Sequence, residues 1–384
     1  SAPTTVSATP VDWTNQTKHK LSWAGIKDYV GLQTLTDNWG VVEYSFDNTG
    51  IWTSTGIRNG SFTDFEVNTS TLLDGEHKIY VRGKDNQGNY GIASFASIKI
   101  DRTGPTMPTL LVAPSTWTNL NAVNLSWSGI ADNRGLNRIE LKMDSNEWVS
   151  AQTNAGNYTN KSIDISGLED GTHTIGVRGI DSVGNIGQEK LINVYKDTTM
   201  PQIDELTITP KGYTNENEVV INWSGVSDVH SGIAKIEYEI DNEGVFVDTT
   251  STAKYGVCGI NIQGLIDGEH HIKLKITDLA GNVNEQKEVT FFKDYSAPQI
   301  EITYPTQNDF ALGKFEVWGN VQDIALKEWV LSVTDLAGNV TELKRDNITG
   351  VISAIVDLET YENGEIVSFH LSAKDKAGNE STVT

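Results

Sequence analysis

Apolar and polar residues alternate along much of this chain with a period of two, which is the pattern of half-buried β-strands. In the segment HTIGVRGID, Ile175 and Val177 fall on one face of the predicted strand, and Thr174 and Arg178 fall on the other. The segment NRIELKMDSNEW, residues 137–148, predicts a strand, an Asp-Ser-Asn turn and a second strand. Because no stretch shows convincing helical periodicity, the sequence predicts an all-β protein.

The same pattern recurs at a nearly fixed interval. The pentapeptide D-x-x-G-N begins at positions 85, 181, 278 and 375, so its copies are 96, 97 and 97 residues apart. A Trp-Thr-Asn or Tyr-Thr-Asn triplet precedes a core tryptophan by ten residues in the first three copies, and an Asp-x-x-x-Pro segment closes each of them. These landmarks predict four repeats: residues 1–102, 103–197, 198–294 and 295–384.

The first and last repeats depart from this pattern. The fourth lacks the opening triplet, and Trp318 stands where we expect its core tryptophan. In the first repeat, 19 residues separate Asp28 from Asp47, where the second and third repeats use 12 and 13 residues between the corresponding aspartates. The sequence therefore predicts a loop insertion in repeat 1, and this insertion carries Trp39.

Each repeat has the length and strand content of one small sandwich. About 95 residues with seven or so short strands, separated by turn signals, are typical of an antiparallel β-sandwich. The alternation pattern leaves the order of the strands open.

The motifs within each repeat resemble a known family. The combination of LSWSG (125–129), L-x-D-G-x-H followed by D-x-x-G-N, and a closing D-T-T-x-P (197–201) is similar to the bacterial immunoglobulin-like repeats of large surface proteins and adhesins. These are relatives in architecture of fibronectin type III modules. The resemblance implies four tandem immunoglobulin-like β-sandwich domains arranged as an elongated rod. It also implies a monomeric, extracellular segment, at the cell surface or secreted.

The charge of the chain narrows the classes of partner. A formal net charge of −22 repels nucleic acid and favours cations. No apolar run of 18 residues is present, which predicts no membrane insertion of this segment. The single cysteine, Cys258, excludes an internal disulfide framework. Because Ser1-Ala-Pro matches Ser296-Ala-Pro after a closing aspartate, we expect a segment of a longer array.

The D-x-x-G-N motif has a structural interpretation. Asp at the first and Gly at the fourth position of a type I turn are favoured, and the motif meets both preferences. A further copy, DLAGN, begins at Asp335, out of register with the repeat and between two predicted strands. A motif that occurs in and out of register is first of all a hairpin turn.

The copies in register allow a second role, in binding a metal ion. Each repeat carries an aspartate five residues after its tryptophan landmark, and the family topology would place this loop, the D-x-x-G-N turn and the preceding closing aspartate at one pole. Ca²⁺ prefers clustered carboxylate and carbonyl oxygens. We therefore expect Ca²⁺ to bind between repeats at three sets of residues: Asp101, Asp132 and Asp181; Asp197, Asp228 and Asp278; Asp294, Asp323 and Asp375.

Recurring aromatic residues follow the central hairpin of the first three repeats at Trp52, Trp148 and Phe246. Packing over the hairpin explains this recurrence. The alternative is a platform on which flat rings stack against a sugar, with neighbouring Asn and Asp bonding its hydroxyls. In that alternative Trp39, Trp52 and Trp148 bind a glycan or a host or cell-surface protein, and the chain is a binding module that accompanies a larger surface enzyme or toxin.

The sequence offers little support for catalysis. His77, His173 and His270 recur after an Asp-Gly turn, but no nucleophile recurs with them and no catalytic or nucleotide-binding motif occurs. We expect strand-start histidines bonded to nearby backbone. The leading hypothesis is therefore a non-enzymatic spacer or stalk of a bacterial surface or secreted adhesin-type protein, stiffened by Ca²⁺ between its domains and requiring no other cofactor.

Overall fold

The computed structural model describes residues 1–27, 40–107, 109–307 and 309–384. Most of the predicted insertion in repeat 1, including Asp28 and Trp39, lies outside the described residues. The chain divides into two compact halves, Ser1–Lys196 and Asp197–Thr384, which are described separately.

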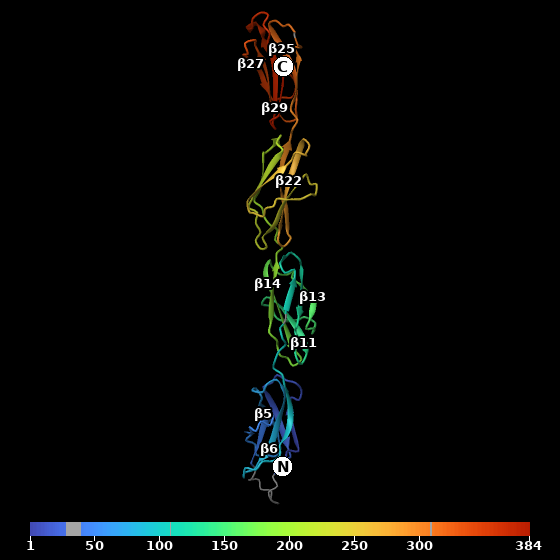
Figure 1. Cartoon of the computed structure of the whole chain (residues 1–384), viewed down its shortest axis with the longest axis vertical. Coiled ribbons are helices and arrows are strands. Elements are labelled where there is room, and N and C mark those ends of the chain that lie inside the picture. Colours follow the sequence, from blue (N-terminus) through green and yellow to red (C-terminus); the bar gives the residue numbers. More distant parts are fainter. Residues whose placement is uncertain (28–39, 108, 308) are drawn as a thin grey trace. The chain divides into compact units, whose positions relative to one another are not determined.

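The first half begins with a sandwich of two sheets in repeat 1 (Figure 1). One sheet has the order β1-β2-β5 and the other the order β4-β3-β6-β7, with antiparallel pairing throughout. The strands are β1 (Thr5–Thr9), β2 (Lys18–Ala24), β3 (Val41–Phe46), β4 (Thr53–Ser54), β5 (Phe62–Asn68), β6 (Gly75–Lys84) and β7 (Ser94–Ile100).

Repeat 2 completes the first half with the same two layers. Its sheets have the orders β8-β10-β13 and β12-β11-β14-β15-β9, and the short β9 pairs in parallel with β15. The strands are β8 (Thr109–Ala113), β9 (Trp117–Thr118), β10 (Ala122–Ser128), β11 (Leu136–Met143), β12 (Val149–Ser150), β13 (Tyr158–Asp164), β14 (Gly171–Asp181) and β15 (Lys190–Lys196).

The second half opens with repeat 3, whose sheets have the orders β16-β18-β21 and β17-β23-β22-β19-β20. The strands are β16 (Glu205–Thr209), β17 (Tyr213–Thr214), β18 (Glu218–Ser224), β19 (Ile233–Ile240), β20 (Val247–Asp248), β21 (Gly256–Asn261), β22 (Gly268–Asp278) and β23 (Val283–Lys293).

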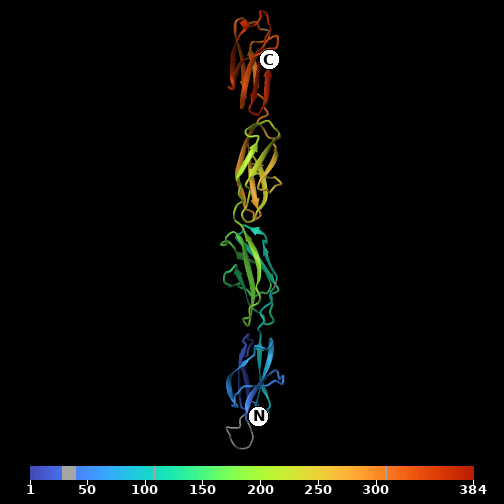
Figure 2. The ribbon, with the colours of Figure 1, turned by 90° about the vertical axis from the view of Figure 1, so that its left-hand side faces the viewer.

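Repeat 4 has the sheet orders β24-β25-β28 and β27-β26-β29-β30, and the view of Figure 2 shows its two layers from another side. Its elements are β24 (Gln299–Tyr304), β25 (Lys314–Gln322), β26 (Leu326–Thr334), β27 (Val340–Asp346), β28 (Gly350–Asp357), the 3-10 turn η1 (Leu358–Thr360), β29 (Ser368–Asp375) and β30 (Glu380–Val383).

Apart from the two-residue β9 and β17, which add a parallel edge strand to repeats 2 and 3, the strand order is the same in all four repeats. With β9 and β17 left out, the first, second and fifth strands of each repeat form one sheet, and the third and fourth form the other with the last two strands. This is the order of fibronectin III-type sandwiches, which belong to the same aligned β-sandwich architecture as immunoglobulin domains. The predicted all-β fold of immunoglobulin-like, fibronectin III-like sandwiches is confirmed by this topology.

Each repeat encloses its own hydrophobic cluster between its sheets. In repeats 1 to 3 a tryptophan of the second strand lies at the centre, with only 2–3% of its surface exposed. Its indole N–H donates to a backbone carbonyl 3.0–3.1 Å away, so the ring is buried without an unpaired donor. These residues are Trp23, Trp127 and Trp223.

Repeat 4 fills its core from the opposite sheet, and the expected equivalence of Trp318 with these tryptophans is wrong. Trp318 on β25 is 40% exposed, because its neighbour Val317 takes the inward position. Trp329 on β26 is 1% exposed, and its indole N–H donates to Ile348 O at 3.0 Å. The landmark was matched by residue type, but side chains on a strand alternate between faces, so a shift of one position reverses the face.

This exchange predicts different effects for the two tryptophans of repeat 4. Trp329→Ala should lower the free energy of unfolding of repeat 4 by about 3–5 kcal/mol, because it opens a cavity in the core. Trp318→Ala should lower it by about 1 kcal/mol or less, as for other surface positions. Differential scanning calorimetry of the full chain measures both variants, and equal destabilisation by the two would contradict this assignment.

Candidate metal centres at the linker aspartates

The aspartate that closes repeat 1 is bonded to both repeats of the first half. Asp101 follows β7 directly, and its backbone N–H donates to Thr14 O at 3.0 Å within repeat 1. Its backbone carbonyl accepts a hydrogen bond from the Asn185 side-chain amide of repeat 2 at 3.0 Å. The main chain of the linker is therefore hydrogen-bonded to the backbone of repeat 1 and to a side chain of repeat 2.

The D-x-x-G-N turn supplies the second aspartate of the site. In repeat 2, one oxygen of Asp181 accepts from the backbone N–H groups of Val183, Gly184 and Asn185 at 2.6–2.8 Å. The other oxygen accepts from the Asn185 side-chain amide at 2.8 Å, and the backbone N–H of Asp181 donates to Asn185 O. These contacts close the hairpin and leave the asparagine amide aimed at the linker.

This turn geometry recurs in all five copies, including the copy out of register at Asp335, whose oxygens accept from Asn339 N and Nδ2 at 2.8 and 2.7 Å. The interpretation as a hairpin turn is confirmed by these bonds. Only the asparagines of repeats 2 to 4, however, donate in addition to the carbonyl of a linker aspartate, at 2.8–3.0 Å. The motif thus closes a hairpin everywhere and holds a linker where it stands in register.

The third aspartate comes from the loop between the second and third strands. Asp132 precedes β11, and its Oδ1 accepts from Arg134 N at 2.7 Å. Asp228 precedes β19, and its Oδ1 accepts from the backbone N–H groups of His230, Ser231 and Gly232 at 2.8–3.0 Å. In both cases one oxygen orders the loop, and in Asp228 the other oxygen, Oδ2, has no hydrogen-bond partner among the described residues.

Two of the three predicted sets converge. In each, one carboxylate oxygen from every aspartate lies within 4.8 Å of the other two: Asp101, Asp132 and Asp181 in the first half, and Asp197, Asp228 and Asp278 in the second. Asp101, Asp181 and Asp197 are 0% exposed, and Asp278 is 2% exposed. For these two sets, the residues that the sequence predicted to lie at one pole are close together in the structure.

Some oxygens of these sets have no hydrogen-bond partner and could therefore bind a cation. Both carboxylate oxygens of Asp101, and Oδ2 of Asp228, are buried and make no hydrogen bond of good geometry among the described residues. Burial raises the pKa of Asp101, and the negative charges of Asp132 and Asp181 raise it further. A buried carboxylate without a donor is unfavourable, and a bound cation would offset both the desolvation and the repulsion.

The donor set suits a hard divalent cation. All contributed atoms are carboxylate oxygens, and Ca²⁺ takes six to eight oxygens at about 2.3–2.6 Å, which places its ligands up to about 5 Å apart. The convergence within 4.8 Å satisfies that limit. The residues that could hold Ca²⁺ are therefore the two converging sets.

The third predicted set is looser. Asp294, Asp323 and Asp375 are not brought within the same mutual distance, although all three are described. Their charges still interact: burial and then Asp375 raise the pKa of Asp294, and burial raises that of Asp323. The loop from Asp323 to β26 is shorter than the loops that follow Asp132 and Asp228, so its backbone holds this carboxylate differently. A metal ion at this set stays a prediction.

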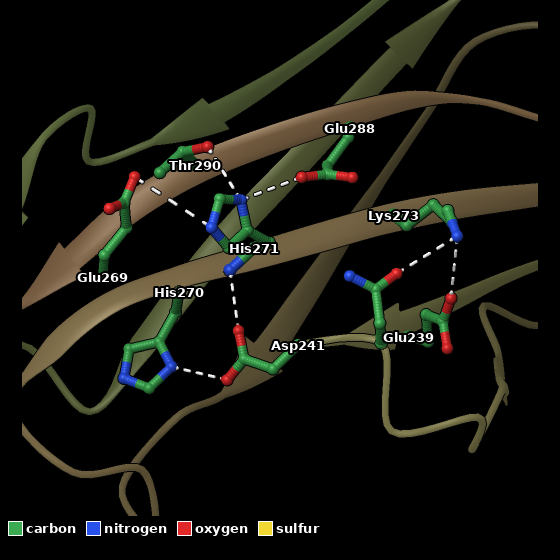
Figure 3. A network of polar contacts seen from close by, with 9 residues as sticks. Glu239, Asp241, Glu269, His270, His271, Lys273, Glu288 and Thr290 are labelled. Carbon is green, nitrogen blue, oxygen red and sulfur yellow. Dashed lines mark hydrogen bonds and ion pairs between the residues drawn. The ribbon is translucent and has the colours of Figure 1, made fainter.

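The recurring histidines are structural. In repeat 3, His270 Nδ1 lies 2.7 Å from Asp241 Oδ2 and its Nε2 lies 2.8 Å from Ile266 O, while His271 N donates to Asp241 Oδ1 (Figure 3). His77 and His173 make the same contacts in repeats 1 and 2. In each case the two ring nitrogens lie between a carboxylate oxygen and a backbone carbonyl. The expected bond to nearby backbone is confirmed.

The hairpin aromatics pack against cations of the neighbouring long strand. The guanidinium carbon of Arg82 lies 3.8 Å from the Trp52 ring centroid, and that of Arg178 lies 4.1 Å from the Trp148 centroid. Each arginine also pairs with a buried glutamate, Glu43 or Glu140. These contacts explain the recurrence of the aromatics. Glycan binding by Trp52 and Trp148 stays a prediction, and Trp39 lies outside the described residues.

Sequence reasoning missed the asparagines that hold the linkers. Asn185, Asn282 and Asn379 were read as turn residues, and their second bond depends on the linker carbonyl being within reach. The constant distance between D-x-x-G-N and the closing aspartate indicated that the two segments are related. It did not identify the asparagine as the donor, because a side-chain amide has several possible partners.

No family model and no curated protein sequence matches this chain. Among solved structures it is similar to the FN1–FN3 domains of chicken CNTN1, with 14% identity over 73% of this chain and 98% of that one and a TM-score of 0.27. It is also similar to part of a 1.5-MDa bacterial ice-binding adhesin described for host cell surface retention (16% identity, 75% of this chain and 95% of that one, TM-score 0.36). A third similar structure contains fibronectin(III)-like modules of Clostridium thermocellum CbhA (18% identity, 48% and 94%, TM-score 0.31).

The resemblance to tandem fibronectin III and immunoglobulin-like domains is thus seen in these structures, whereas the fold assignment itself rests on the strand order described above. Within the described part of the chain, no helix has the length and apolar character needed to cross a membrane.

The raised pKa of Asp101 predicts a pH-dependent effect of Asp101→Asn. A carboxyl group with a raised pKa in the folded state stabilises most below its unfolded pKa of about 3.8–3.9 and loses that contribution as pH rises through the folded pKa. In EDTA at pH 7, Asp101→Asn should therefore raise the melting temperature of the first half, and this gain should vanish below about pH 4. In Ca²⁺ the same variant should be less stable than the wild type. Calorimetry at both pH values tests this; equal destabilisation in EDTA and in Ca²⁺ would show that the carboxylate has only a structural role.

Proposed function

We propose that this chain is a non-catalytic, extracellular spacer of a bacterial surface or secreted protein, with repeats joined through Ca²⁺. The observation that carries this proposal is the joint of the first half, where a fully buried linker carboxylate without donors lies beside two further carboxylates. The residues that recur in every copy are used in cores, hairpins and joints, which is what a mechanical segment requires.

The joint is built to keep successive repeats in a fixed relation when the cation is bound. Asp101 belongs to the end of repeat 1, whereas Asp132 and Asp181 belong to two loops of repeat 2, so a cation at this set cross-links the linker to the next domain. The ring of Trp13 adds a direct contact, because the Arg134 guanidinium carbon lies 3.3 Å from its centroid. Without the cation, repulsion among the three carboxylates favours opening of the joint.

An extracellular location agrees with this design. Ca²⁺ sites of extracellular modules commonly bind at about 10⁻⁴–10⁻³ M, a concentration available outside cells. A formal net charge of −22 also keeps such a segment soluble and apart from other copies. The resemblance of LSWSG and D-T-T-x-P to repeats of bacterial adhesins supports the same location.

Small-angle X-ray scattering of the full chain tests the spacer function. At about 3.3 Å per residue, strands of about 6–8 residues together with the loops at both ends give domains of about 35–40 Å. Four in series would reach about 150 Å, with a radius of gyration of about 40 Å. A compact globule of 384 residues would have a radius of gyration of about 21 Å. We expect the larger value in Ca²⁺ and a broader distribution of distances in EDTA. The smaller value in Ca²⁺ would refute a spacer.

A further inference from the structure

One pole of repeat 4 exposes four large apolar side chains. Phe310 is 102% exposed, Leu312 89%, Leu336 77% and Ile366 73%. They come from the loop between β24 and β25, the turn between β26 and β27, and the segment between η1 and β29. These four residues are called the apolar pole below.

The three segments form a hydrogen-bonded frame. Leu336 N donates to Glu365 Oε1 at 3.3 Å, which joins the β26–β27 turn to the segment before β29. Leu358 N donates to Gly313 O at 3.0 Å, which joins η1 to the loop that carries Phe310. The backbone of Glu362 and the carboxylate of Glu365 are joined by a further bond of 2.9 Å. These bonds hold the backbone of Leu336 and the residues next to Leu312 and Ile366.

The surroundings of the apolar pole are acidic. In the described residues of 305–314, 335–339 and 357–366, Lys314 is the single basic residue. Against it stand six carboxylates in the same segments: Asp309, Asp335, Asp357, Glu359, Glu362 and Glu365. A partner that covers the apolar side chains therefore gains from positive charge at its rim.

The corresponding face of other repeats shows what such a surface accepts. In repeat 1, Trp13 lies between β1 and β2. The guanidinium of Arg134 from the following repeat stacks over its ring. In repeat 3, the equivalent Tyr213 has the ammonium of Lys376 from repeat 4 at 5.5 Å from its ring centroid. Phe310 is the aromatic residue of this loop in repeat 4, and its ring is fully exposed.

We propose that the apolar pole of repeat 4 is a docking surface for a protein segment that combines lysine or arginine with aliphatic side chains. The aliphatic groups cover Phe310, Leu312, Leu336 and Ile366, and the cations reach the Phe310 ring and the surrounding carboxylates. Exposed apolar patches rimmed by polar groups mark interaction sites in soluble proteins. A second copy of this chain is a poor occupant, because each copy carries a net charge of −22. Anionic lipid is repelled by the same carboxylates.

The test uses the full chain and a defined probe, a fluorescein-labelled peptide of alternating lysine and leucine. Two further peptides replace leucine by serine or lysine by glutamate. Fluorescence anisotropy should show saturable binding of the lysine–leucine peptide, at least tenfold weaker binding of the lysine–serine peptide and no binding of the glutamate–leucine peptide. Phe310→Ser/Leu336→Ser should weaken binding of the first peptide at least about tenfold, because central apolar anchors carry most of the energy of such contacts.

The matched control is Ile51→Ser/Ile92→Ser in repeat 1, which removes two apolar side chains that are 75% and 79% exposed. This variant should bind the lysine–leucine peptide like the wild type. Equal loss in both variants, or equal binding of the lysine–leucine and lysine–serine peptides, would reduce the effect to net charge and overturn the proposal. Two other outcomes would also overturn it: binding to neutral phosphatidylcholine vesicles without peptide binding, or self-association that Phe310→Ser/Leu336→Ser abolishes.

Discussion

Burial of linker carboxylates beside other carboxylates is the constraint on which the joints of this protein depend. Asp101 and Asp197 are fully buried, and each lies with two further aspartates whose oxygens converge within 4.8 Å. In water such groups would separate, because each carboxylate loses hydration on burial and repels its neighbours. Hydrogen bonds hold them in place: the asparagine of each turn holds the linker carbonyl, and backbone N–H groups hold the loop aspartates. The arrangement thus concentrates negative charge at a place where a cation could bind.

The remaining recurrent residues keep each repeat rigid enough for this arrangement to matter. Every described sandwich has its own core, and the histidine–aspartate contacts tie the central hairpin to the longest strand of repeats 1 to 3. Arg82 and Arg178 connect a buried glutamate to an aromatic ring on the same sheet. These contacts hold the strands and hairpins within each of these repeats together.

The sequence predicted the fold class and most of the candidate site, because both depend on periodic features. Alternation identifies strands, and the spacing of D-x-x-G-N and the closing aspartates identifies loops that meet at a pole. The alternation could not give the face of a single residue whose register was uncertain, which is why Trp318 was assigned to a core that Trp329 occupies. The carboxylates of Asp294, Asp323 and Asp375 do not converge like those of the other two sets, and the loop after Asp323 is one or two residues shorter than its equivalents. The spacing of motifs along the sequence does not give the distances between side chains in the folded protein. The bonds of Asn185 and its equivalents also depend on tertiary contact.

The sequence DLAGN occurs twice in the second half, and comparing the two copies tests the central claim most directly. Asp278 and Asp335 begin identical pentapeptides and make matching turn bonds, but only Asp278 belongs to a converging set. Calorimetry of Asp278→Asn and Asp335→Asn in EDTA and in millimolar Ca²⁺ separates the two roles of the motif. In both variants the asparagine Oδ1 can still accept from the backbone N–H groups of the turn, whereas the bond from the Asn282 or Asn339 side-chain amide to the second oxygen is lost. Only Asp278→Asn should also lose most of the Ca²⁺-induced rise in melting temperature of the second half. An equal Ca²⁺ response in both variants, or none in the wild type, would contradict a cation at the linker aspartates.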